Sequence, residues 1–342
     1  MKKQFCNSSF GDLIGAQSIC VTVFFALCAL LFALSASALA QSAAKIPRIG
    51  FLTGGGNTFS VEAFREGLRA LGYIEGENIA IEYRSADGYP ERISGFVAEL
   101  VQLKAEVLVT TSPAVRAAKQ ATKTIPIVMV TQEDPVATGL VASLARPGEN
   151  ITGITSLSRD LGSKRLELLK ETVPKVSRVG VLWDTTDSTS AGIGFKEYKA
   201  AAPTLKLQIQ SLEVRGPIPD LETAFEAAVK GRVNGLITIR NFLFNRYQKQ
   251  IADLAIKNRL PLMSERSDYV ESGGLVSYSS NDADNYRRAA YYVDKILKGI
   301  NPADLPIEQP TKFEFVINLK TAKQIGVTVS PNVLYRADRV IR

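Results

Sequence analysis

The sequence predicts an α/β protein with two doubly wound parallel sheets, each covered by helices on both of its faces. Two observations support this fold class. From Ile46 onward, short apolar segments rich in β-branched residues alternate with longer amphipathic segments, which is typical of repeated strand–helix units. The pattern contains about ten strands, more than one ordinary domain holds, and the 342 residues provide enough chain for two domains.

The first half of the alternating region begins with a buried strand at residues 48–53, which ends at the glycines 54–56. A helix follows with Val61, Phe64 and Leu68 on one face, and Gly72 ends it. The next segments are expected to be a strand at 79–83, a helix at 90–103, and strands at 107–111 and 127–130. The last two are continuous apolar runs, the pattern of parallel strands buried on both faces.

The alternation restarts after Gly153 and continues to the end of the chain. Helices are expected at 163–172, 194–202, 220–230, 244–258 and 283–297, and strands at 178–183, 207–212, 235–239, 260–263 and 274–278. A connection marked by three prolines then leads to a final strand at 313–317 and a short helix from Leu319.

Residues 1–40 have the composition of a secretory signal peptide. Lys2 and Lys3 are followed by an apolar run at 19–34 and by small residues that end at Ala40. The apolar run is shorter than the roughly 20 residues that a membrane-spanning helix needs. We therefore expect cleavage after Ala40 and no stable membrane insertion afterwards. An uncleaved anchor and a lipid attached to Cys28 are the alternatives.

All three cysteines, Cys6, Cys20 and Cys28, precede the expected cleavage point. The mature chain would therefore have no cysteine and could form no disulfide. An exported protein of this size can rely on a large apolar core in place of disulfides. This composition favours the periplasm of a Gram-negative bacterium.

The chain contains no histidine. Together with the loss of the cysteines, this excludes Cys-His and Ser-His-Asp catalysis and zinc sites built on His or Cys. We expect no metal, no cofactor and no enzymatic activity. An exported α/β enzyme built on a carboxylate or a lysine is the alternative, and turnover of a small substrate would reveal it.

The 41 basic and 34 acidic residues give a net charge of +7. The basic residues are scattered along the chain and form no run that resembles a nucleic-acid-binding arm. We expect no nucleic-acid partner.

Three blocks of the chain resemble a known protein family. They are residues 67–78 (GLRALGYIEGEN), residues 134–141 with 146–153 (DPVATGLV and RPGENITG), and residues 316–323 (VINLKTAK). These blocks are similar to the solute-binding proteins of ABC transporters, in the family related to the tryptophan- and tyrosine-binding components. The resemblance covers essentially the whole chain after the signal peptide, with the blocks in the same order.

The resemblance implies the type I periplasmic binding protein fold, in which two lobes joined by three crossover strands capture a small molecule in their cleft. It places one lobe at 46–155 plus 279–312 and the other at 156–278 plus 313–342. It also implies a small-molecule solute and a membrane ABC permease as partners, and a monomeric receptor. A sensor that reports its solute to a signalling receptor is the alternative.

Ligands of open parallel sheets bind beyond the carboxyl ends of the strands, where helix N-termini offer free N–H groups. In the first lobe this rule selects Asn57 and Thr58 after the first strand, Ser112 after the third, and Thr131 and Gln132 after the fourth. The alternatives are a tight turn at 54–58 and simple helix capping by Ser112.

In the second lobe the same rule selects Trp183 and Asp184, Arg240 and Asn241, and a segment that contains Glu265 and Asp268. Trp183 would stack on a planar solute or pack in the core. In the related aromatic-amino-acid binders Asp-Asn tends to stand where this chain has Arg240-Asn241, so we expect Arg240 to face an anionic group of the ligand. The alternative is a surface arginine paired with a neighbouring acid. The resemblance assigns Asp268 to an α-ammonium group.

Overall fold

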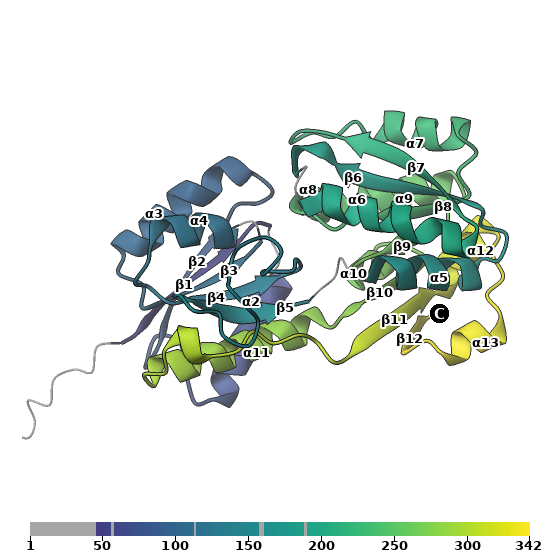
Figure 1. The fold of residues 1–342 in the computed structure, drawn as a ribbon. Coiled ribbons are helices and arrows are strands. Elements are labelled where there is room, and N and C mark those ends of the chain that lie inside the picture. The colour runs from purple at the N-terminus through teal and green to yellow at the C-terminus, as the bar shows by residue number, and fades with distance from the viewer. Residues whose placement is uncertain (1–45, 56–57, 113, 157–160, 188–189) are drawn as a thin grey trace, which may run out of the picture. The chain divides into compact units, whose positions relative to one another are not determined.

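The computed structural model describes residues 46–55, 58–112, 114–156, 161–187 and 190–342, so the expected signal peptide lies outside the described residues. The chain divides into two units, Met1–Ile46 and Pro47–Arg342. The second unit contains two β-sheets with helices on both faces of each (Figure 1). None of the described helices has both the length and the apolar character needed to cross a membrane.

The first sheet has five parallel strands in the order β2-β1-β3-β4-β5. They are β1 (Arg48–Thr53), β2 (Ala80–Ser85), β3 (Val107–Thr111), β4 (Ile127–Thr131) and β5 (Ile151–Thr155). Every residue of β3, β4 and β5 is buried. The continuous apolar runs predicted this for β3 and β4, whereas no strand was expected from the sequence at β5. Because all five strands are parallel, their carboxyl ends meet at one edge of the sheet.

Helices cover both faces of this sheet (Figure 1). On one face lie α2 (Thr58–Ala70) and α11 (Asp282–Leu297), and on the other lie α3 (Ile93–Gln102) and α4 (Ala114–Ala121). The helices α2 and α11 approach closely at Gly67, where an added Cβ would lie 2.8 Å from the Cβ of Ala290. A helix from late in the sequence therefore completes the core of the first sheet.

The second sheet has seven strands in the order β12-β11-β10-β9-β8-β6-β7. They are β6 (Arg178–Asp184), β7 (Gln208–Val214), β8 (Gly235–Thr238), β9 (Leu262–Ser264), β10 (Val276–Ser280), β11 (Phe313–Asn318) and β12 (Arg339–Ile341). The expectation of wholly parallel strands is wrong at one point, because β11 runs antiparallel to β10. The chain returns to this sheet at the carboxyl end of β10, where Phe313 pairs with Ser280, and so must run back along it.

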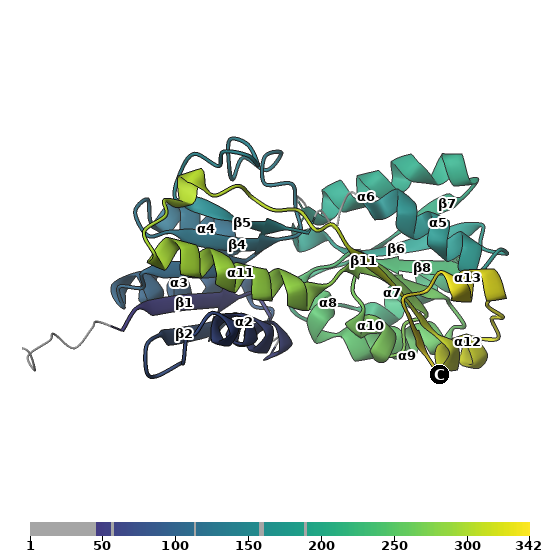
Figure 2. The ribbon, with the colours of Figure 1, turned by 90° about the horizontal axis from the view of Figure 1, so that it is seen from below.

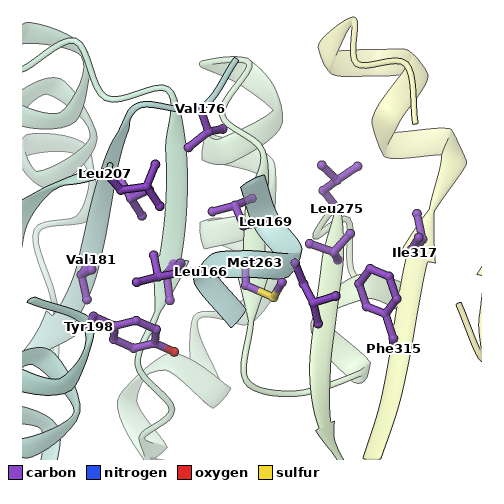
Figure 3. Packing of buried hydrophobic residues seen from close by; sticks show 14 of the residues in the cluster. Leu166, Leu169, Val176, Val181, Tyr198, Leu207, Met263, Leu275, Phe315 and Ile317 are labelled. Carbon is purple, nitrogen blue, oxygen red and sulfur yellow. The ribbon is translucent and has the colours of Figure 1, made fainter. Parts of the chain in front are cut away.

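Helices also cover both faces of the second sheet. On one face lie α5 (Gly162–Thr172) and α6 (Ser190–Ala201), and on the other lie α7 (Leu221–Lys230), α8 (Phe242–Arg246) and α9 (Gln248–Lys257). Figure 3 shows Leu166 and Leu169 of α5 and Tyr198 of α6 with Met263 and Phe315 of the sheet, all in one buried cluster.

The remaining elements are short. They are α10 (Asp268–Glu271), α12 (Leu319–Ile325), α13 (Pro331–Tyr335) and the 3-10 helices η1 (Pro90–Arg92), η3 (Thr185–Asp187), η4 (Ala202–Leu205) and η5 (Pro302–Asp304). The helix expected at 244–258 is divided at Tyr247 into α8 and α9. The pattern also missed β5 and the very short elements α10, α13 and β12, which have three to five residues each and show no periodicity.

The chain passes between the two sheets three times, between β5 and α5, between β10 and α11, and between α11 and β11. The third connection runs beside β5 on its way to β11 (Figure 2). There the N–H of Glu308 donates to the carbonyl of Gly153 at 3.0 Å, and the N–H of Thr155 donates to the carbonyl of Glu308 at 2.9 Å. Two doubly wound sheets with crossover connections are the type I architecture that the sequence predicts.

Candidate functional site

A cavity of about 410 Å³ lies at the carboxyl ends of strands from both sheets. Its walls come from segments that follow β1, β2, β8 and β9. They include Gly55, Gly88, Tyr89, Asn245, Arg266 and Asp268. This is the position at which open parallel sheets bind their ligands.

A second hollow, of about 460 Å³, lies over the outer sides of α7 and α9. Its lining includes Glu222, Lys249 and Asp253, which lie on exposed helix surfaces and not at strand ends. Although it is slightly larger, it is a surface groove with solvated charges. The cavity at the strand ends is therefore the candidate functional site.

Tyr89 forms an aromatic wall of the cavity. The guanidinium carbon of Arg92 lies 4.4 Å from the centre of its ring, and that of Arg246 lies 4.8 Å from it. Both distances are within the range of cation–π attraction. The cavity thus combines a flat apolar surface with two exposed cationic groups, a suitable lining for a solute with an aromatic and an ionic part.

Asp268 lies in the cavity lining, where the sequence places a ligand-binding carboxylate. Its Oδ1 accepts a hydrogen bond from Nε of Arg266 at 2.8 Å, and its Oδ2 accepts one from Nη2 of the same guanidinium. The side chain of Arg266 is 8% exposed and that of Asp268 is 38% exposed. The carboxylate therefore has a cationic partner within the chain and still faces the cavity. Its role toward an ammonium group stays a prediction.

Arg240 is nearly buried, with 9% of its side chain exposed, and its Nη1 donates to Oδ1 of Asp282 at 3.1 Å. Arg240 is therefore paired with an acid, as in the alternative, but it does not lie on the surface. That it faces an anionic group of the ligand stays a prediction. The backbone N–H of Arg240 donates to Oε2 of Glu265 at 3.1 Å. Asp282 thus gives Arg240 a carboxylate that belongs to the protein.

Asn241 is the N-cap of α8, where its Oδ1 accepts from the N–H of Phe244 at 2.8 Å. Its amide Nδ2 is buried and has no hydrogen-bond partner among the described residues. The same holds for Oδ1 of Asn245, which lines the cavity. Of these two amides, that of Asn245 is in the cavity lining and is available to a polar solute.

At the edge of the first sheet the structure brings Ser112 and Thr131 together, with 2.6 Å between their hydroxyl oxygens. Thr131 also accepts from the N–H of Glu133 at 3.3 Å. Gln132, which follows Thr131 in the chain, is half-buried. Pro113, which precedes α4, lies outside the described residues. Asn57 and the side chain of Thr58 also lie outside them.

Trp183 and Asp184 are engaged in local contacts. The indole of Trp183 stacks on Phe195 with 5.2 Å between ring centres and 13° between ring planes, and its Nε1–H donates to Ser211 at 2.8 Å. Asp184 accepts from the N–H and the hydroxyl of Thr186, at 2.9 and 2.5 Å. These contacts favour the core-packing alternative for Trp183 and a turn-stabilising role for Asp184.

A buried ionic network lies behind the strand ends. Arg165 of α5 is 0% exposed and donates from Nη1 to Oε1 of Glu265 at 3.2 Å, and from Nε to the carbonyl of Tyr278 at 2.8 Å. The hydroxyl of Tyr198 donates to the same Oε1 at 2.8 Å. Burial, and then the charge of Glu265, raises the pKa of Tyr198, so its phenol stays a proton donor.

Sequence reasoning missed five charged or aromatic residues of the cavity lining, and it missed Asp282 outside the lining. The five are Asp87, Tyr89, Arg92, Arg246 and Arg266. Tyr89 follows β2 within a few residues, so the strand-end rule applied to β2 would have selected it. Arg266 lies inside the selected segment between Glu265 and Asp268 but was not singled out. Asp282 begins a helix, and nothing in its local pattern distinguishes it from an ordinary N-terminal acid. No group of three or more His, Cys, Asp or Glu side chains that could hold a metal ion occurs within the described ranges.

Comparisons with known proteins agree with this architecture. The chain is 27% identical over 280 residues to the tyrosine-binding protein of Clostridioides difficile, which covers 78% of this chain and 76% of that protein. A conserved domain protein of Vibrio cholerae has a similar structure, with a TM-score of 0.80, 27% identity, and coverage of 86% of this chain and 100% of that chain.

An ABC domain from Streptococcus pneumonia, solved in complex with L-Trp, shares the fold with a TM-score of 0.78 and 24% identity, and covers 86% of this chain and 99% of that chain. Residues 45–341 match the family described as ABC transporter substrate binding protein. This match spans nearly all of the chain that follows the expected signal peptide. The chain therefore belongs to the ABC transporter substrate binding protein family.

Proposed function

We propose that the chain is the periplasmic solute receptor of an ABC importer. It captures a small amino acid-like solute, or another small carboxylate or aromatic solute, between two lobes. The lobes comprise residues 46–155 plus 279–312 and residues 156–278 plus 313–342. The observation that carries the proposal is the cavity of about 410 Å³ lined by strand-end segments of both sheets. The family match and the sequence pattern of residues 1–40 support transport and export.

The chemistry of the cavity supports an amphipathic solute of amino-acid size. Tyr89 offers a face for an aromatic or aliphatic group, and Arg92 and Arg246 lie beside it with exposed positive charge. Asp268 offers negative charge on another part of the lining. The tyrosine-binding relative makes an aromatic amino acid the first candidate.

Capture works by hinge closure in this proposal. The three connections between the sheets are the places where the backbone can bend. A solute that contacts segments from both sheets binds the closed form better than the open form, and this difference in affinity shifts the population toward closure. A permease can then distinguish the loaded receptor from the empty one. No covalent step is required.

Addition of the correct solute is expected to raise the melting temperature of the mature protein and to reduce its scattering radius. Binding to the folded state alone contributes about 2.7 kcal/mol at a hundredfold excess over Kd. A thermal-shift screen with L-tyrosine, L-tryptophan, other amino acids and aromatic carboxylates would identify the solute, and small-angle scattering would measure closure. Chemical turnover of a bound solute would contradict the proposal, and so would cytoplasmic protein with residues 1–40 intact.

Replacing Tyr89 by leucine is expected to weaken binding of that solute by about tenfold or more, because the aromatic ring and its contacts with the guanidinium groups of Arg92 and Arg246 are lost. Titration calorimetry measures the change in Kd. The matched control is Tyr335→Leu, since Tyr335 is 93% exposed and lies outside the cavity lining. Equal affinities of the two variants would show that the solute binds elsewhere.

A further inference from the structure

Two arginines emerge side by side at the edge of the second sheet. Thr238 of β8 is aligned with Ser264 of β9, and Arg240 and Arg266 each follow two residues later. Their side chains are only 9% and 8% exposed. Two like charges removed from water at neighbouring positions are costly unless carboxylates compensate them.

The compensating carboxylates are Asp268 and Asp282. Asp268 binds Arg266 through both of its oxygens, and Asp282 binds Arg240 at 3.1 Å. Burial would raise the pKa of Asp282, but Arg240 and then Arg266 outweigh it and leave the pKa below its usual value. Asp282 is therefore ionised at neutral pH and interacts with both arginines.

Each of the three buried arginines of this group has a carboxylate partner among the described residues. Glu265, whose Oε2 accepts from the backbone of Arg240, has its own cation in Arg165. At the strand ends, the positive charge of Arg240 is paired with Asp282, and that of Arg266 is paired with Asp268. An anionic solute would have to compete with Asp282 for the positive charge of Arg240.

The position of Asp282 suits this competition. It is the first residue of α11, next to the N-cap Asn281, and α11 packs on the first sheet. Its side chain is 20% exposed, so an ion from solvent can reach the pair. Asp284, in the same helical turn, is 66% exposed and binds Arg287. Substitution of Asp284 is therefore a control for substitution of Asp282, because it also removes one carboxylate from the start of α11.

We propose that Asp282 is a specificity-determining residue, a built-in carboxylate that occupies Arg240 and disfavours solutes with net negative charge relative to zwitterionic ones. This inference rests on the proposed function, because it assumes that the cavity next to Arg266 binds a solute. It also predicts an anion site that appears when the carboxylate is removed, whether or not the solute is known.

The first test is therefore independent of the solute. Sodium sulfate is titrated into wild type, Asp282→Asn and Asp284→Asn, with sodium chloride at matched ionic strength. Sulfate stabilises most folded proteins, so the difference between variants is the readout. We expect sulfate to raise the melting temperature of Asp282→Asn by about 2 °C or more beyond the other two proteins. The double variant Arg240→Gln/Asp282→Asn should lose this extra response.

The second test compares L-tyrosine with 3-(4-hydroxyphenyl)propionate, which keeps the carboxylate and ring but lacks the ammonium group. In Asp282→Asn the ratio of the two affinities should shift toward the anion by about tenfold, or about 1.4 kcal/mol, while Asp284→Asn keeps the wild-type ratio. If neither compound binds any variant, the amino-acid part of the proposed function fails, and the sulfate response alone decides the role of Asp282. Equal sulfate responses of Asp282→Asn and Asp284→Asn, or an extra response that persists in the double variant, would overturn the inference.

Discussion

Replacing Glu265 by alanine is expected to lower the free energy of unfolding by about 3–5 kcal/mol, because it removes the carboxylate that faces a buried guanidinium. Arg165 is 0% exposed and Glu265 is 2% exposed, with 3.2 Å between the paired atoms. The variant also removes the acceptor of the Tyr198 hydroxyl and of the Arg240 N–H. Urea unfolding followed by circular dichroism measures the loss.

The matched control is Glu171→Ala, which breaks an ion pair with Arg336 whose two side chains are 33% and 46% exposed. Exposed pairs contribute about 0–1 kcal/mol, so this variant should be nearly as stable as the wild type. A double variant, Arg165→Met/Glu265→Met, should recover much of the loss, since a buried pair can be replaced by apolar groups of similar size. A loss below about 1 kcal/mol in Glu265→Ala would show that the network does not stabilise the fold.

The second large effect is expected at Gly153, in the middle of β5. Its φ is +133°, and an added Cβ would lie 2.1 Å from the carbonyl oxygen of Met129 on β4. Neither the backbone conformation nor the space admits a side chain, so Gly153→Ala must distort the pairing of β4 with β5. We expect a loss of about 3 kcal/mol or more in urea unfolding.

Gly95→Ala is the control for this substitution, because nothing lies within 4 Å of an added Cβ in the interior of α3. Alanine favours a helix over glycine by about 0.5–1 kcal/mol, so this variant should gain stability. Gly153 also accepts the hydrogen bond from Glu308 in the third connection between the sheets. A Gly153→Ala protein with wild-type stability would mean that β5 can move away from β4 without cost.

The alternation of apolar runs predicted most of the strands and helices, because burial on two faces leaves a continuous apolar signal in each central strand. It did not predict the direction of β11, which depends on where the chain returns after α11. The break between α8 and α9 at Tyr247 was also missed, since both helices turn apolar residues toward the same core. The strand-end rule selected both Asp268 and Arg240. The structure places Asp268 in the cavity lining, whereas Arg240 is nearly buried and outside the lining.

The sequence by itself determined the alternating α/β pattern, the family resemblance, the absence of histidine and the edge of the sheets where a solute would bind. Only the tertiary structure decided which charges neutralise one another. Arg165 and Glu265 are 100 positions apart, and Arg240 and Asp282 are 42 apart. The energy of an ion pair depends on distance and on burial, and both arise only when distant segments pack together. For this reason the sequence, which shows Arg240 without its partner, suggested that the arginine binds an anionic ligand. The structure shows that Arg240 pairs with the carboxylate of Asp282 in the protein itself.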